Sequence, residues 1–193
     1  MTGTATWVDA LAPTAPDVVA AWRAIVSGRL IEVRRQVRRR AGEGTAAHTA
    51  TQLAALADAL TAIVEQLSDA DLQRDGGEGG WNVAQAIGHD GDARAGLCLA
   101  AAKAAARQWP SDAPQVVPGI PGPPDADRAT LVRKIVQSQR IVERAARTVS
   151  GHETEPCPLD HPLVGRMRCG EWLLFAGIHD LMHLEQLHGI IGQ

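Results

Sequence analysis

Apolar residues recur every three or four positions in five stretches of the chain, which is the period of an α-helix with one buried face. The clearest stripe consists of Leu53, Leu56, Leu60, Ile63, Val64 and Leu67. The predicted helices cover about residues 16–40, 45–67, 81–108, 125–149 and 170–190. No stretch of useful length alternates with the period of two that a half-buried strand requires. The pattern therefore predicts an all-α fold in which long helices form a bundle.

Glycine, proline and capping residues mark the segments between these helices. Asn82 followed by Gln85 predicts a capping box at the start of the third helix. Residues 109–124 contain six prolines, which exclude a helix or a central strand. They predict a long loop, and loops of this length are often functional. Residues 150–169 are expected to be irregular.

Composition and charge narrow the class of protein. The chain has 193 residues, of which 45% are hydrophobic, and its formal net charge is −3. This balance gives no electrostatic case for nucleic-acid binding, and no apolar run approaches the ~20 residues that span a bilayer. We find no secretory signal, and three widely spaced cysteines form neither a disulfide framework nor a zinc-binding pair. We therefore expect a cytoplasmic protein that binds neither membranes nor nucleic acid.

A run of arginines between Arg34 and Arg40 is a local departure from this charge balance. Such a run could bind phosphate groups or nucleic acid. Cations at the C-terminal end of a helix also complement the helix dipole, so we expect a solvated helix end.

Two histidines on the last predicted helix, His179 and His183, are four residues apart. Side chains at this spacing project side by side, about 6 Å apart, so both imidazoles could bind one metal ion. Trp172, Ala176 and Leu187 share their helical face, which predicts that the pair points inward. The alternative is two histidines that are exposed or hydrogen-bonded separately, and the spacing alone leaves both alternatives open.

The string His179-Asp180-Leu181-Met182-His183 is similar to the zinc-protease motif His-Glu-x-x-His but departs from it. Asp180 is one methylene shorter than the glutamate that serves as general base in that motif. Only ten residues follow His183, and position 189 is glycine, so the further ligand of that class has no place. We therefore do not expect a metalloprotease.

A third metal ligand has to come from upstream in the chain. The best candidate is His89, which lies two turns into the third predicted helix. Less well placed are His48, His152, His161 and His188. Three histidines that leave coordination positions open are typical of a catalytic metal site, and neutral imidazole suits zinc, nickel, iron or copper.

These histidines stand in a longer series of motifs. The series comprises Trp81-Asn82-Val83, His89, Gly165-Arg166-Met167, Glu171-Trp172-Leu173-Leu174-Phe175 and His179-Asp180-x-x-His183-x-x-Gln186-Leu187. In order and spacing it resembles the DinB-like (YfiT-like) metal-binding superfamily over about residues 45–190. The resemblance implies an up-down four-helix bundle over residues 45–193. Residues 1–44 would add an accessory N-terminal helix that packs on the bundle or joins a homodimer.

The resemblance also implies a site. The metal ligands of the family correspond to His89, His179 and His183, and the ion would be divalent, with zinc and nickel the first candidates. Around them, orienting the ligands or lining a pocket, would lie Trp81, Trp172, Asp180 and Gln186.

Two functions are compatible with this resemblance, because fold does not fix function. The first is a metal-dependent enzyme, a thiol-dependent S-transferase or isomerase that uses a low-molecular-weight thiol and acts on a small electrophile. The second is a non-catalytic bundle that binds a metal or a small molecule in an unknown, stress-related role. An open cavity that reaches the histidines would favour the enzyme, and a packed interior the binding protein.

Overall fold

The computed structural model describes residues 6–26, 30–77 and 79–191, and the chain in these ranges is mostly helical. The helices are Trp7–Leu11 (α1), Pro16–Val26 (α2), Leu30–Arg40 (α3), Ala46–Val64 (α4), Asp69–Leu72 (α5), Val83–Ala105 (α6), Arg128–Val149 (α7) and Cys169–Ile191 (α8). Two short strands, Pro156–His161 (β1) and Gly165–Arg168 (β2), lie between α7 and α8. No described helix is both long enough and apolar enough to cross a membrane.

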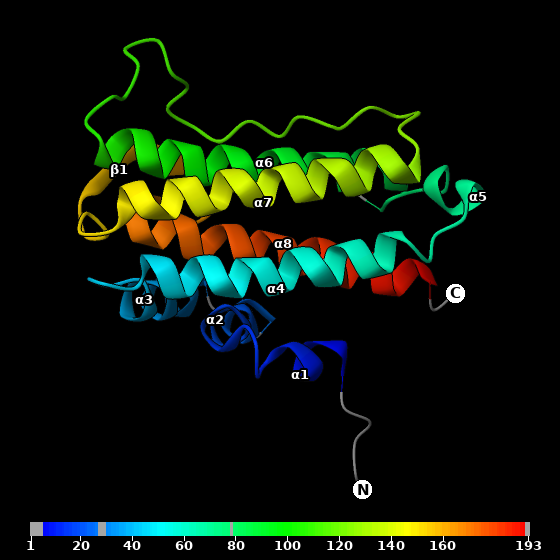
Figure 1. Cartoon of the computed structure of the whole chain (residues 1–193), viewed down its shortest axis with the longest axis horizontal. Coiled ribbons are helices and arrows are strands. Elements are labelled where there is room, and N and C mark those ends of the chain that lie inside the picture. Colours follow the sequence, from blue (N-terminus) through cyan, green and yellow to red (C-terminus); the bar gives the residue numbers. More distant parts are fainter. Residues whose placement is uncertain (1–5, 27–29, 78, 192–193) are drawn as a thin grey trace, which may run out of the picture.

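Helices α4, α6, α7 and α8 form a four-helix bundle (Figure 1). Each of α4 and α6 packs against both α7 and α8, whereas α4 and α6 lie on opposite corners. The predicted all-α four-helix bundle is therefore confirmed. The helices do not alternate in direction throughout the bundle, because α6 and α7 run the same way. Asp92 on α6 pairs with Lys134 on α7, and Arg94 bonds to Gln139 further along both helices. The order of directions is up, down, down, up.

The proline-rich connection between α6 and α7 makes this parallel pair possible, because it carries the chain back along the whole bundle (Figure 1). The predicted loop is confirmed there, and several hydrogen bonds fasten it to the rest of the protein. The Gly122 amide donates to the Gln85 carbonyl at 3.0 Å, and the Val117 amide donates to the Asp160 carbonyl at 3.1 Å. At Gly122 two glycine backbones meet, since a Cβ atom on Gly122 would lie 2.6 Å from the Cα atom of Gly88.

The start of α6 follows the predicted capping box. The side chain of Asn82 accepts a hydrogen bond from the Gln85 amide at 2.8 Å, and the Asn82 amide donates to the Gln85 side chain at 3.1 Å. These bonds satisfy backbone donors that lack partners inside the helix. The cap therefore fixes the first turn of the helix that carries His89.

The prediction of one helix over residues 16–40 is wrong. The structure has two helices there, α2 and α3, which pack against each other, as one straight helix could not. The part of the prediction that falls on residues 27–29 lies outside the described residues. The physical reason is tertiary packing, which overrides the local helical period. Both helices pack on α8, and the buried side chain of Gln52 on α4 accepts hydrogen bonds from the Asp17 and Val18 amides.

The prediction of an irregular segment over residues 150–169 is also wrong, because β1 and β2 form an antiparallel hairpin. Cys157 and Leu159 are buried and alternate with exposed Pro156 and Pro158. Both strands of a two-stranded hairpin are edge strands, and proline is tolerated where its backbone nitrogen faces away from the partner strand. The prolines therefore did not prevent pairing. The hairpin packs beside α6, and its Asp160 carbonyl accepts the hydrogen bond from Val117 in the connection between α6 and α7.

The arginine run lies at the C-terminal end of α3, and three of its side chains bind other parts of the protein. Arg38 pairs with the buried carboxylate of Glu171 at 2.9 Å, and Arg40 lies 3.5 Å from Asp17. Arg34 donates to the carbonyl of Arg166 at 3.3 Å. These contacts tie α3 to α8, α2 and β2 and leave fewer free arginine side chains to bind a polyanion.

The glycine contact at Gly122 gives a testable prediction. Gly122→Ala should lower the free energy of unfolding by about 1–3 kcal/mol, because the new methyl group meets backbone atoms that cannot rotate away. Gly119→Ala is the matched control in the same connection, since a Cβ atom there meets nothing within 4 Å. Urea unfolding of both variants measures the difference, and equal stabilities would contradict the close contact.

Candidate metal centre

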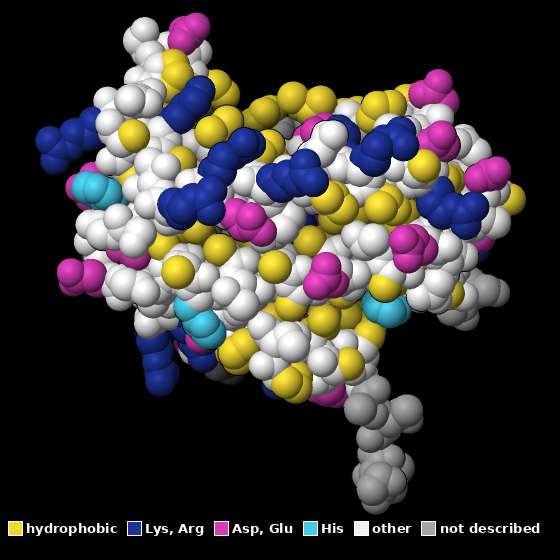
Figure 2. All heavy atoms as spheres, viewed as in Figure 1, with side chains coloured by type: hydrophobic (Ala, Val, Ile, Leu, Met, Phe, Trp, Pro, Cys, Tyr) yellow, Lys and Arg dark blue, Asp and Glu magenta, His cyan; other side chains and the backbone are white. Residues whose placement is uncertain are grey.

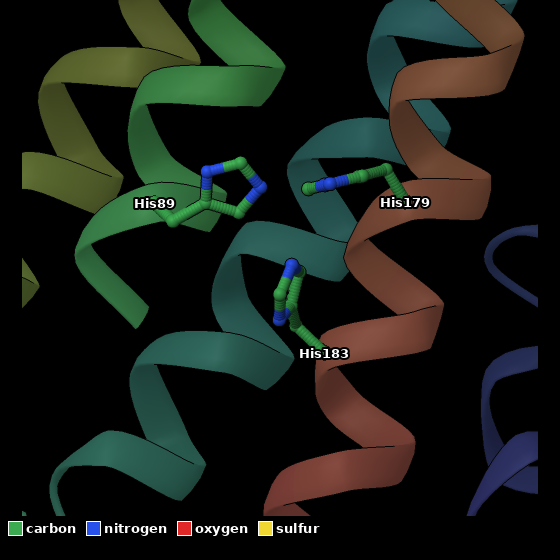
Figure 3. A group of neighbouring side chains, drawn as sticks. All are labelled: His89, His179 and His183. Atoms are coloured by element: carbon green, nitrogen blue, oxygen red, sulfur yellow. The ribbon is translucent and has the colours of Figure 1, made fainter. Parts of the chain in front are cut away.

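The structure brings together the three histidines that the sequence singles out. His89 comes from the second turn of α6, and His179 and His183 come from α8, which packs antiparallel to it (Figure 3). The ring centroids of His179 and His183 are 4.6 Å apart, and the His89 centroid lies 5.2 Å and 5.5 Å from them. His89 and His183 are buried and His179 is partly exposed. All three rings point toward a common centre (Figure 3).

Each of these rings has an oxygen acceptor at Nδ1. The Nδ1 atom of His89 lies 2.7 Å from the carbonyl oxygen of Ile120, and that of His179 lies 3.2 Å from Oδ1 of Asp90. The Nδ1 atom of His183 lies 2.9 Å from Oε1 of Gln186, whose amide group donates to the Gly76 carbonyl. A carbonyl or carboxylate oxygen can only accept, so the proton of each ring belongs on Nδ1. The Nε2 atoms remain as ligand atoms.

This donor set fits a metal ion. One ring nitrogen from each histidine lies within 4.8 Å of the other two. Zinc–nitrogen bonds measure about 2.0–2.1 Å, so small ring rotations place one ion within reach of all three. Nδ1–H groups that donate to oxygen are the usual second layer of a histidine metal site, because they fix the tautomer and the ring orientation. Burial lowers the pKa of His183, which keeps that ring neutral and able to ligate.

A buried ionic layer lies directly behind the histidines. Arg94 and Asp180 are fully buried, with Nε of Arg94 3.4 Å from Oδ2 of Asp180. The Arg94 guanidinium also donates to the Leu53 carbonyl at 2.9 Å and to the Gln139 side chain at 3.0 Å. One side chain of α6 therefore contacts α4, α7 and α8, and it fixes how these helices face one another.

The pKa values of the two carboxyl groups beside Arg94 are shifted in opposite directions. Burial raises the pKa of Asp180 well above its usual range, and the nearby Asp90 carboxyl adds to that effect against the opposing charge of Arg94. Burial also disfavours charge on Asp90, but the hydrogen bond from His179 and the charge of Arg94 hold its pKa below the usual range. Asp90 is therefore the carboxylate that accepts the hydrogen bond from His179.

A second group of ligand atoms, from Asp90, His179 and Asp180, also lies within 4.8 Å. The Arg94 guanidinium borders that group and would repel a cation. A metal ion bound there would also occupy the Asp90 carboxylate, which orients His179. The histidine triad is the better centre.

The other predicted site residues lie at different distances from the triad. The Trp81 ring packs on His89 with centroids 5.0 Å apart, and Gln186 contacts His183. Asp180 belongs to the ionic layer rather than to the triad. Trp172 is fully buried against Phe175, with ring centroids 5.9 Å apart, so it is a core anchor.

Two residues near the site, Asp90 and Arg94, were missed by the sequence analysis, and a third, His161, was named there only as a less well placed metal ligand than His89. Asp90 and Arg94 follow His89 on α6 by one and five positions, but α6 also carries the charged residues Asp92 and Lys103, which are not buried, so charge alone could not have singled them out. His161 lies on β1, in the segment that was expected to be irregular. Its Nδ1 accepts hydrogen bonds from the amides of Leu163 and Val164, so its proton is on Nε2.

A pocket of about 300 Å³ adjoins the triad on the outer side of α6. Its floor is α6 from His89 to Lys103, and its cover is the connection from Trp109 to Ile120, with Leu159 of β1 at one side. The pocket therefore leaves open space beside His89.

Fold and site together define the class: an all-α bundle that presents three histidines from two antiparallel helices. Comparison with protein families gives a match to the DinB superfamily over residues 52–187, and the chain belongs to that superfamily. The matched range contains the whole triad. Neither the curated proteins nor the solved structures gave a match.

The surroundings of His161 predict an unusual titration. Burial, aided by the charge of His179, lowers its pKa from 6.5 to about 4. The unfolded chain then binds this proton at a higher pH than the folded chain, so stability should fall as pH decreases from 6.5 toward 4. An NMR titration of the metal-free protein should give His161 a midpoint near 4. A midpoint near 6.5 in wild type, or an unchanged pH dependence of stability in His161→Gln, would contradict this assignment.

Proposed function

We propose that this protein is a metal-dependent enzyme that holds one divalent ion on His89, His179 and His183. The observation that carries the proposal is the arrangement of the six imidazole nitrogens. Each Nδ1 atom faces an oxygen acceptor and each Nε2 atom remains for an ion. Three separately hydrogen-bonded histidines would not need to converge within 4.8 Å.

Each ligand is held by a different part of the fold. The Ile120 carbonyl, on the proline-rich connection, orients His89, and the Trp81 ring packs on the same imidazole. Asp90 orients His179, and its negative charge makes that imidazole a stronger ligand. Gln186 orients His183 and is itself fixed by the Gly76 carbonyl. Zinc and nickel both suit three neutral imidazoles.

Three protein ligands leave coordination positions for a substrate or a cofactor, as in catalytic rather than structural sites. When bound, the ion would lower the pKa of a coordinated thiol or water and so supply a nucleophile at neutral pH. We propose that the nucleophile is a low-molecular-weight thiol and that the second substrate is a small electrophile. The open pocket beside His89 supports an enzyme rather than a non-catalytic binding protein.

The protein's own cysteines are poor candidates for that thiol. Cys98, Cys157 and Cys169 are all buried. Burial raises the pKa of Cys98 and of Cys169 to about 12, so neither forms a thiolate at neutral pH. An external thiol is therefore required. The homodimer and the cytoplasmic location stay predictions.

Metal content tests the ligand set. His183→Ala should lower bound zinc or nickel from about one ion per chain to near zero after dialysis, because two imidazoles hold a divalent ion far less tightly than three. The matched control is His188→Ala, one turn further along α8, where the ring stacks on Trp7 instead of facing the triad. Elemental analysis of both variants and of wild type decides the matter, and retention of the ion by His183→Ala would overturn the ligand assignment.

Catalysis needs a separate test. Zinc-loaded protein incubated with a panel of low-molecular-weight thiols and a chromogenic electrophile should accelerate thioether formation over chelator-treated protein. The acceleration should disappear in His183→Ala and persist in His188→Ala. If the protein retains its ion but no thiol gives acceleration, the enzyme proposal fails and the non-catalytic alternative takes its place.

A further inference from the structure

The pocket beside the triad is long and narrow rather than round. Its residues on α6 recur at helical spacing along one face: His89, Asp92, Ala93, Gly96, Leu97, Leu99, Ala100 and Lys103. With a rise of 1.5 Å per residue, the 14 positions from His89 to Lys103 span about 21 Å. A pocket that follows this face fits an extended molecule better than a compact one.

Its walls are almost entirely apolar, and they are incompletely covered. Leu99 and Ile120 line the pocket and are 45% and 62% exposed. Hydrophobic side chains gather where the connection between α6 and α7 crosses the bundle, along the upper edge of Figure 2. Gly96 leaves further room, because a Cβ atom built on it meets nothing within 4 Å. Concave apolar surface of this kind is typical of a ligand site.

Charged groups lie at opposite ends of the pocket and are not equivalent. Asp92, near the His89 end, pairs with Lys134. Lys103, at the other end, has no ion pair among the described residues. Lys134 compensates the charge of Asp92, whereas the charge of Lys103 is uncompensated, so a ligand carboxylate would be attracted to the Lys103 end and take one orientation.

We infer that this pocket binds an extended aliphatic carboxylate, with the carboxylate at Lys103 and the chain along α6 toward His89. The inference rests on the proposed function in one respect, because as a substrate this molecule would carry an electrophilic group at the end of the chain near His89. An activated double bond is such a group: the thiol S–H bond and the C=C π bond would break, and an S–C bond and a C–H bond would form. Binding itself needs only the pocket. It can therefore be measured on metal-free protein, apart from any test of the ion.

Dodecanoate is a suitable probe, with dodecanol as its neutral analogue and hexanoate as its short one. Calorimetry on chelator-treated wild-type protein should give one dodecanoate per chain, bound at least tenfold more tightly than dodecanol or hexanoate. Quenching of Trp109, which lines the pocket, should follow the same curve and be absent in Trp109→Phe. No saturable binding of dodecanoate would overturn the inference.

Two variants locate the ligand. Lys103→Met should weaken dodecanoate at least tenfold and leave dodecanol unchanged, whereas Arg144→Met, which removes an exposed cation from α7, should change neither. Gly96→Leu should abolish binding of both while the protein unfolds at the same or higher temperature, because leucine is a better helix former than glycine. Unchanged dodecanoate affinity in either Lys103→Met or Gly96→Leu would contradict this placement.

The two proposals can fail separately. His183→Ala should lose its ion and still bind dodecanoate, and Gly96→Leu should keep its ion and lose dodecanoate. Wild-type protein that holds its ion but ignores dodecanoate would overturn the pocket alone. Protein that binds dodecanoate but no ion would overturn the metal centre and leave the pocket as a binding site.

Discussion

The contact of Arg94 with Asp180 in the interior of the bundle is the constraint on which the site depends. A buried guanidinium is strongly unfavourable unless charged and polar partners surround it, and breaking one such partnership typically costs about 3–5 kcal/mol. Here the partners come from three other helices: Asp180 on α8, the Leu53 carbonyl on α4 and Gln139 on α7. Any sliding of α8 along α6 would separate them. The layer therefore sets the register that brings His89 opposite His179 and His183.

The same register links the metal centre to the rest of the fold. Asp90 contacts the ionic layer on one side and His179 on the other, so the charge that stabilises the bundle also orients a ligand. Ile120 performs the corresponding task for His89 from the proline-rich connection. That connection also covers the pocket, which begins at His89. A change in the position of one segment would thus alter both the ligand orientation and the space available to a substrate.

The sequence predicted what local period and spacing determine. Helical stripes, the Asn82–Gln85 cap and the one-turn spacing of His179 and His183 depend on neighbours in the chain, so they could be found. The hairpin of β1 and β2 could not, because its strands are short, contain prolines and are stabilised by pairing with each other. The break between α2 and α3 and the parallel arrangement of α6 and α7 depend on tertiary packing. Arg94 and Asp90 looked like ordinary surface charges on α6, and only burial reveals their role.

The claim that three Nε2 atoms converge on one ion can be tested atom by atom. Long-range proton–nitrogen NMR on zinc-loaded protein distinguishes the two nitrogens of every imidazole. The structure predicts that His89, His179 and His183 are metal-bound through Nε2 and protonated at Nδ1, with the other histidines unchanged by zinc. If any of the three keeps a protonated Nε2 in the presence of stoichiometric zinc, or binds through Nδ1, the account of the centre is contradicted.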